Sequence, residues 1–140
     1  MRILYVEDNP RDADLVRRSL LGGPAPAQQF EVASTLAAAR AALVEPLRFD
    51  LVLTDLNLPD GNGLELVAEI RQRSLPLAVV ALTSQGDEGL VLAALKAGAN
   101  DYLAKSDDIA ARVGATARAA LAAFRAFLEA GVLVTVNSDD

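Results

Sequence analysis

Short, unbroken apolar runs recur along this chain, and stretches with helical spacing separate them. Runs without polar alternation are typical of strands that are covered on both faces. The predicted strands lie at Ile3–Val6, Phe30–Ala33, Leu51–Leu53, Leu77–Leu82 and Tyr102–Ala104. The predicted helices lie at Ala13–Leu21, Thr35–Val44, Gly63–Arg71, Glu88–Ala97 and Asp108–Glu129. Strands that alternate with helices of this length predict right-handed βαβ units, so we expect an α/β fold with one parallel sheet.

Three of the predicted helices carry recognisable end signals. Ser34 or Thr35 can cap the second helix at its start, because a hydroxyl oxygen accepts a hydrogen bond from a free backbone N–H. Gly98 can end the fourth helix and Gly131 the last one, because glycine readily adopts the conformation that follows a helix.

The chain of 140 residues has the usual size of one domain. We expect that domain to cover residues 1–130. The β-prone segment Val132–Val136 falls outside the repeating pattern, so residues 131–140 form a C-terminal tail in this interpretation. Unpaired β-prone segments tend to find partners, and the tail therefore predicts contact with a second subunit.

Composition excludes several classes of function. The chain has no cysteine and no histidine, which removes disulfides, thiolate metal sites and Ser–His–Asp hydrolysis. Its net charge of −6 disfavours nucleic acid as a partner, because phosphate contacts need Lys and Arg. We expect neither a membrane span nor a signal peptide, since the opening apolar run is short and ends at acids. The sequence therefore predicts a cytoplasmic protein.

Polar side chains follow four of the predicted strands, at the point where each strand ends. Glu7 and Asp8 follow the first strand, Asp55 the third, Thr83 the fourth and Lys105 the fifth. Because ligands of parallel α/β sheets bind beyond the carboxyl ends of the strands, we expect these groups to converge there.

Three carboxylates brought together repel one another, and a divalent cation relieves that repulsion. Mg²⁺ prefers oxygen ligands and takes one or two carboxylates while it keeps several waters. We expect Asp8 and Asp55 to bind Mg²⁺ directly and Glu7 to act through water. The backbone carbonyl of Asn57, in the loop after Asp55, is the expected fourth contribution.

The same group of residues suits phosphoryl transfer. A carboxylate such as Asp55 can attack phosphorus and form an acyl phosphate. Lys105 would offer a compact positive charge to one phosphoryl oxygen and Thr83 a hydroxyl donor to another. The small side chain of Ser84 would leave room for the group to enter.

These residues stand in motifs that resemble the receiver domain of response regulators in two-component signalling. The motifs are Leu4-Tyr5-Val6-Glu7-Asp8-Asn9, Leu53-Thr54-Asp55-Leu56-Asn57-Leu58-Pro59-Asp60-Gly61-Asn62-Gly63, Ala81-Leu82-Thr83-Ser84 and Gly98-Ala99-Asn100-Asp101-Tyr102-Leu103-Ala104-Lys105. They occur in order over residues 1 to about 129, and their joint spacing is specific where each alone is weak.

The resemblance implies a flavodoxin-like, doubly wound sheet of five parallel strands in the order 2-1-3-4-5 with five helices. It also implies that Asp55 is the phosphoacceptor, that a phosphohistidine on a sensor kinase is the donor, and that Mg²⁺ is the cofactor. Thr83 and Tyr102 would be a switch pair that changes the surface of the fourth helix, fifth strand and fifth helix. Such a protein is a phosphorylation switch and not an enzyme with an external substrate.

Two positions depart from the family pattern. Glu7 stands where the family often has a second Asp, and Glu is a familiar variant there. Ser106 follows Lys105 where the family usually has proline, so a cis peptide bond is not expected at this point.

Each site residue alone also has a structural interpretation. Glu7, Asp8 and Asn9 could equally cap the first helix. Asp55 could be a turn residue, and Lys105 a solvated lysine. The joint occurrence of these residues at successive strand ends favours the functional interpretation.

Three other functions are considered. An aspartyl phosphohydrolase of similar fold has an Asp-x-Asp nucleophile motif on its first strand, which Glu7-Asp8-Asn9-Pro10 does not match. A flavodoxin-type flavin carrier needs a Ser/Thr/Gly-rich loop after that strand, where this chain is acidic. A receiver-like module that has lost phosphorylation would lack one of these groups.

The partners implied by the resemblance are a sensor histidine kinase and a downstream protein target. The segment Glu7-Asp8-Asn9-Pro10-Arg11-Asp12 and the C-terminal tail resemble single-domain regulators that serve bacterial phytochrome kinases. A homodimer would form through the fourth helix, fifth strand and fifth helix or through the tail. Phe127 lies off the apolar stripe of the last helix and is a candidate contact residue.

Overall fold

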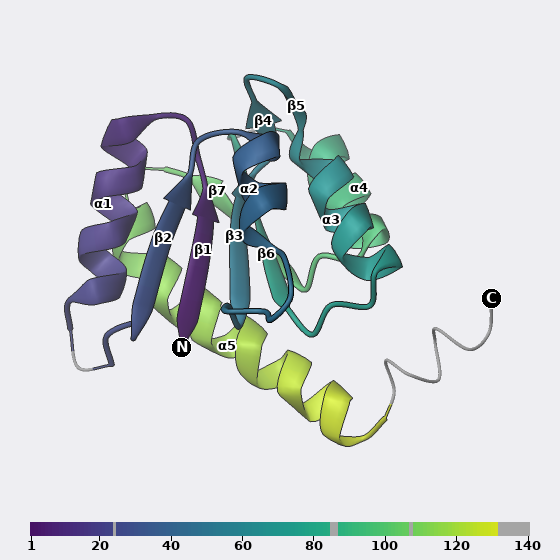
Figure 1. Cartoon of the computed structure of the whole chain (residues 1–140). Helices are drawn as coiled ribbons and strands as arrows, with labels where there is room; N and C mark the ends of the chain where they lie inside the picture. Colours follow the sequence, from purple (N-terminus) through teal and green to yellow (C-terminus); the bar gives the residue numbers. More distant parts are fainter. Residues whose placement is uncertain (24, 85–86, 107, 132–140) are drawn as a thin grey trace.

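In the computed structural model, one five-stranded parallel sheet has helices on both of its faces (Figure 1). The structure describes residues 1–23, 25–84, 87–106 and 108–131. The predicted tail segment Val132–Val136 lies outside these residues.

The strand order is β2-β1-β3-β6-β7, which is the predicted order 2-1-3-4-5 once a small separate hairpin is left out of the count. The sheet strands are β1 (Arg2–Val6), β2 (Gln29–Ala33), β3 (Leu51–Asp55), β6 (Ala78–Ser84) and β7 (Asp101–Lys105). The hairpin strands are β4 (Asn57–Leu58) and β5 (Gly61–Asn62). The sequence analysis missed this hairpin because its strands are only two residues each and carry no apolar run.

All five predicted helices are present. They are α1 (Pro10–Leu21), α2 (Leu36–Ala42), α3 (Gly63–Gln72), α4 (Glu88–Ala97) and α5 (Ile109–Glu129). α1 starts three residues earlier than predicted, because Asn9 accepts hydrogen bonds from the N–H groups of Arg11 and Asp12 and Pro10 suits the first turn. Thr35, not Ser34, caps α2, and Gly98 ends α4 in the left-handed region as predicted.

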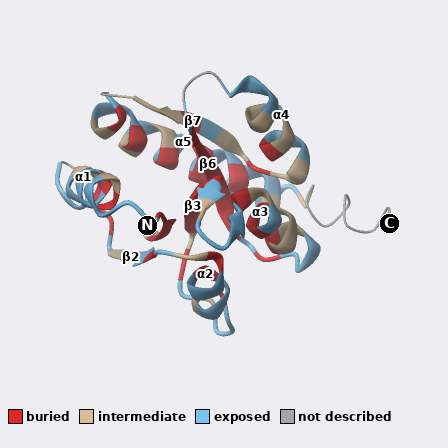
Figure 2. Cartoon of the chain, turned by 90° about the horizontal axis from the view of Figure 1, so that it is seen from above, coloured by how far each residue is buried: buried red, intermediate tan, exposed pale blue. Residues whose placement is uncertain are grey.

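The sheet separates two apolar clusters, as strands covered on both faces require. Alternate residues of β1 point to opposite faces, so Ile3 and Tyr5 pack under α1 and α5, whereas Leu4 and Val6 pack under α2, α3 and α4. Seen from above in Figure 2, the buried residues concentrate on the strands and on the helix faces turned toward them. The two clusters hold the sheet rigid, and its carboxyl edge is thereby a fixed frame for side chains.

The helices of the described residues were also compared with the length and hydropathy that a membrane span needs. None of them is both long and apolar enough to cross a bilayer.

Candidate phosphoryl and metal site

Four of the five residues predicted to converge at the carboxyl edge, Glu7, Asp8, Asp55 and Lys105, lie together there, and Thr83 lies near the end of the neighbouring strand β6. β3 pairs with β1 on one side and with β6 on the other, and β7 pairs with β6. Glu7 and Asp8 follow β1, Asp55 ends β3 and Lys105 ends β7. Oxygen atoms of the three carboxylates of Glu7, Asp8 and Asp55 lie within 4.8 Å of one another. Separate chain segments thus supply one acidic cluster with a lysine beside it.

This cluster fits a small, hard divalent cation. Glu7 and Asp55 are buried, with 2% and 5% of their surface exposed, whereas Asp8 is exposed at the mouth. Two buried carboxylates and one accessible one offer oxygen ligands and leave room for water, which is the ligand set that Mg²⁺ takes. The donor set therefore supports the predicted metal site.

Lys105 is the cation of the site. Its Nζ donates to Asp55 Oδ2 at 2.7 Å, contacts Glu7 Oε1, and reaches Asp12 Oδ2 at 3.3 Å. Burial lowers the pKa of Lys105, but the hydrogen bonds and charges of Asp55 and Glu7 outweigh that effect and raise it. The ammonium therefore stays charged and available to a phosphoryl oxygen.

The electrostatics of Glu7 show that carboxylates are in excess. Burial raises the pKa of Glu7, and the neighbouring charge of Asp55 adds to the rise, while the hydrogen bond from Lys105 opposes it. Without a second cation, the ionised carboxylates of the site repel one another, and this repulsion destabilises the folded protein.

Asp55 presents its carboxylate in a fixed direction. Its Oδ1 accepts a hydrogen bond from the N–H of Asn57 at 3.0 Å, and its Oδ2 accepts the one from Lys105. Gly63 lets the start of α3 lie against this strand end, because a Cβ there would overlap the backbone carbonyl oxygen of Asp55. The sequence analysis did not assign this close approach to Gly63.

Asn57 lies at the start of the β4–β5 hairpin, with an exposed side chain. Asp60, in the same hairpin, accepts hydrogen bonds from the N–H groups of Leu36 at 2.8 Å and Ala37 at 3.1 Å. These bonds tie the hairpin to the start of α2, and they lower the pKa of Asp60. The backbone that carries Asn57 is therefore held in place from outside the acidic cluster.

Thr83 and Tyr102 both line a hollow of about 320 Å³ at the start of α4. Its lining also includes Ser84, Asp87, Glu88, Val91 and Ala104. Thr83 is buried at the end of β6, whereas Tyr102 has 44% of its surface exposed. Thr83 and Tyr102 therefore line one cavity, Thr83 as a buried residue and Tyr102 as an exposed one.

The cis peptide bond among the described residues lies between Glu45 and Pro46. The bond after Lys105 is therefore trans, as expected.

Two residues of the site were not predicted from the sequence. Asp12, in the first turn of α1, contacts Lys105, and Tyr5 donates its O–H to Glu7 Oε1 at 3.1 Å. Strand alternation is the signal that could have found Tyr5, because residues two apart on a strand point to the same face. No local pattern brings Asp12 to Lys105.

Comparison with known proteins gives a consistent result. The model of the response regulator receiver domain matches residues 3–131. The transcriptional regulatory protein BasR of Escherichia coli is 35% identical over 121 residues, which cover 84% of this chain and 53% of BasR.

Two solved structures are similar over most of their length. One is the phosphorylated cyanobacterial phytochrome response regulator RcpA, with a TM-score of 0.74 and 28% identity over 82% of this chain and 89% of that one. The other is the Mn²⁺-bound form of the response regulator Rcp1, with a TM-score of 0.71 and 35% identity over 81% and 88%. By contrast, the chain spans about half the length, or less, of several curated relatives.

Proposed function

The chain belongs to the response regulator receiver domain family of two-component systems, and we propose that it is a switch phosphorylated on Asp55. The observation that carries the proposal is the position of the Asp55 carboxylate, buried between an acidic cluster and the ammonium of Lys105. Glu7 is also buried and also contacts Lys105, but Asp55 is the carboxylate that ends β3, the central strand of the sheet.

In the proposed reaction, a carboxylate oxygen of Asp55 attacks the phosphorus of a phosphohistidine on a sensor kinase. The P–N bond breaks, the imidazole of the kinase leaves with the bonding electron pair and takes up a proton, and an acyl phosphate forms on Asp55. The histidine must belong to the partner, because this chain has none.

Lys105 and Thr83 would hold the transferred group. Lys105 Nζ already lies 2.7 Å from Asp55 Oδ2, so a phosphoryl oxygen on that side replaces the carboxylate oxygen as its acceptor. The hydroxyl of Thr83, at the end of the neighbouring strand β6, would donate to a second oxygen. Phosphoryl transfer depends mainly on such positioning and on neutralised charge.

The proposed cofactor is Mg²⁺, held by Asp8 and Asp55 directly, by Glu7 through water and by the backbone carbonyl of Asn57. When bound, it supplies positive charge that offsets the carboxylates and the phosphoryl oxygens. The similar response regulator Rcp1 has been solved in an Mn²⁺-bound form, and this supports a divalent cation for the present chain as well.

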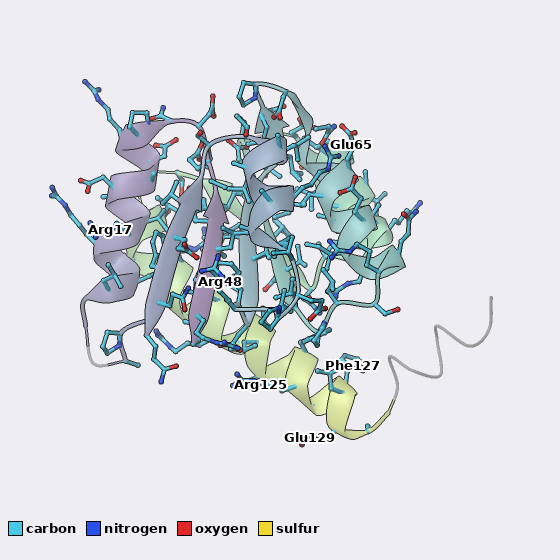
Figure 3. All side chains as sticks on the ribbon, in the orientation of Figure 1. Arg17, Arg48, Glu65, Arg125, Phe127 and Glu129 are labelled. Carbon is cyan, nitrogen blue, oxygen red and sulfur yellow. The ribbon has the colours of Figure 1, made fainter. Side chains whose placement is uncertain are left out.

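The proposed output is a change on the surface formed by α4, β7 and α5. As Thr83 turns toward the phosphoryl group, it leaves space in the shared cavity, and the exposed ring of Tyr102 can turn inward. Exposed apolar side chains already lie on these helices at Leu92, Leu95 and Phe127, the last of which is labelled on α5 in Figure 3. A protein target or a second copy of the chain would bind there.

The proposed partners are a sensor histidine kinase of the phytochrome type and a downstream protein, with no direct contact to nucleic acid or membrane. The phytochrome assignment rests on the Glu7-to-Asp12 segment and on the similarity to a phytochrome response regulator. The C-terminal tail, residues 131–140, is proposed as a dimer contact, which truncation after Glu129 and a measurement of solution mass would test.

The phosphorylation proposal is tested by intact-protein mass after incubation with acetyl phosphate, with and without Mg²⁺. We expect one phosphoryl adduct that requires Mg²⁺ and is lost in Asp55→Asn. Asp14→Asn is the matched control, because Asp14 is an exposed acid on α1 that pairs with Arg18. Equal labelling of Asp55→Asn, or no labelling of the wild-type chain under any condition, would reject the switch.

A further inference from the structure

Tyr5 lies beneath the acidic cluster, and neither the phosphoryl chemistry nor the metal ligand set uses it. We infer that Tyr5 is a positioning residue of the metal site, which holds the Glu7 carboxylate in place from below. This inference rests on the proposed Mg²⁺-dependent function and names a further residue of the same site. It follows from how the two oxygens of Glu7 are occupied.

The geometry begins with strand alternation on β1. Tyr5 and Glu7 are two residues apart, so both side chains project from the same face of the sheet, the one covered by α1 and α5. The ring of Tyr5 is fully buried and meets the ring of Phe30 edge-on, with 6.2 Å between centroids. Its hydroxyl is therefore directed by a packed ring and not by a mobile chain.

The described residues provide three donors to the Glu7 carboxylate. Tyr5 O–H at 3.1 Å and Lys105 Nζ share Oε1, and the backbone N–H of Asn9 reaches Oε2 at 3.2 Å. Two of these three come from rigid elements, namely a packed ring and the backbone at the start of α1. The third, Lys105, also contacts the carboxylates of Asp12 and Asp55.

The consequence is that Oε1 shares one of its two described donors, Lys105, with Asp12 and Asp55. The hydroxyl of Tyr5 is its other described donor, so this phenol fixes the orientation of the buried end of the carboxylate. A carboxylate that acts on the metal through water belongs to the outer shell of the site, and loss of an outer-shell partner commonly weakens metal binding about tenfold or more.

A purely structural role makes a different prediction. A buried phenol needs an acceptor, and Glu7 could simply satisfy it. In that case Tyr5→Phe would change the stability of the protein and leave its affinity for Mg²⁺ unchanged. Metal affinity, measured on the unphosphorylated protein, therefore separates the two roles.

The experiment is titration calorimetry with Mg²⁺ on the full chain and on Tyr5→Phe, Glu7→Gln and the double variant. We expect Tyr5→Phe to weaken Mg²⁺ binding about tenfold. We also expect it to add nothing in the Glu7→Gln background, because Tyr5 acts through Glu7. Leu121→Ala is the matched control, since Leu121 belongs to the same apolar cluster but lies near Met1, at the other end of the sheet.

Equal affinity of wild type and Tyr5→Phe would overturn the inference and leave the proposed function intact. The same holds if the double variant loses the full product of the two single effects, or if Leu121→Ala weakens Mg²⁺ binding as much as Tyr5→Phe. Failure of the wild-type chain to bind Mg²⁺ would overturn both the inference and the metal-dependent function.

A spectroscopic measurement gives an independent readout. The chain has two tyrosines and no tryptophan, so Tyr102→Phe leaves Tyr5 as the only near-ultraviolet chromophore apart from phenylalanine. Saturating Mg²⁺ should shift the absorption of Tyr5 in this variant, and the added Glu7→Gln change should remove the shift. An unchanged Tyr5 band at saturation would contradict the inference.

Discussion

At the carboxyl edge of the sheet, the carboxylates of Glu7, Asp12 and Asp55 share the ammonium of Lys105, and Asp8 adds a further negative charge. At the amino edge, charged groups are matched with partners. Arg2 forms a two-pronged pair with Asp50, with distances of 3.0 and 3.3 Å, and the same carboxylate receives Arg125 at 3.7 Å.

The amino edge also contains a partly buried guanidinium with several acceptors. Arg71 donates to the carbonyls of Gly98 and Leu77 and to Asn100 Oδ1, at 2.9, 2.8 and 2.7 Å, and its guanidinium lies 5.0 Å from the ring centre of Phe124. The arginines at this edge thus have acceptors within the protein, whereas the carboxylates at the other edge outnumber the one lysine that they share. The comparison indicates that the amino edge serves stability and the carboxyl edge serves function.

The largest expected effect concerns the lysine of the carboxyl edge. Lys105→Met should slow phosphoryl uptake about 100-fold, because removal of one preorganised donor to a developing charge typically has an effect of this size. Mass spectrometry over time measures it, with Mg²⁺ binding as evidence of an intact site. Lys96→Met, on the exposed last turn of α4, should label at the wild-type rate. Labelling of Lys105→Met at the wild-type rate would contradict the role of Lys105 in phosphoryl uptake.

The next effect tests the amino edge. Arg71→Met leaves the carbonyls of Gly98 and Leu77 without this donor, and we expect it to lower the free energy of unfolding by about 2 kcal/mol. Urea unfolding measures the change. Arg73→Met removes a bond to the carbonyl of Leu43 at 2.9 Å and should have less effect. A changed Mg²⁺ affinity in Arg71→Met would contradict the assignment of stability to the amino edge and function to the carboxyl edge.

A smaller effect concerns the added cation. Mg²⁺ at about ten times its dissociation constant should raise the free energy of unfolding by about 1.4 kcal/mol, because it binds the folded state. Asp8→Asn should remove most of this gain, since Asp8 is the accessible ligand of the cluster. Thermal unfolding with Mg²⁺ and with a chelator measures it. An equal gain in the free energy of unfolding for the wild-type chain and Asp8→Asn would show that Mg²⁺ binds at another site.

The smallest effect is a pH dependence of opposite sign at the two edges. Burial raises the pKa of Glu7 above its value in the unfolded chain, so its contribution to stability is present at low pH and is lost as pH rises through the raised pKa. Burial also raises the pKa of Asp50, but hydrogen bonds from Arg2 outweigh burial and lower it. Its contribution is therefore present above the unfolded pKa and is lost as pH falls through the lowered one.

Urea unfolding of the metal-free protein as a function of pH separates these contributions, because the pKa of Glu7 is raised and that of Asp50 is lowered. Glu7→Gln should flatten the decline toward neutral pH, and Asp50→Asn should flatten the decline toward acid. Curves that respond to neither change would show that other groups control the pH dependence.

The sequence predicted the frame of the site well and its internal contacts poorly. The carboxyl ends of β1, β3, β6 and β7 were visible because each apolar run stops at a polar residue. The start of α1 was placed too late because the cap at Asn9 competed with a functional interpretation of the same segment. The β4–β5 hairpin was missed because two-residue strands have no periodicity to read.

Local pattern by itself determined which side chains end each strand, since burial on both faces forces an apolar run to stop where the sheet edge meets solvent. Only the tertiary structure decided which of those side chains are in contact. Asp12 and Lys105 are 93 residues apart, and their contact depends on how α1 packs against α5, the helix that follows β7. The two bonds by which Asp60 holds the start of α2 depend likewise on distances that packing sets, whereas strand alternation already places Tyr5 and Glu7 on one face of the sheet.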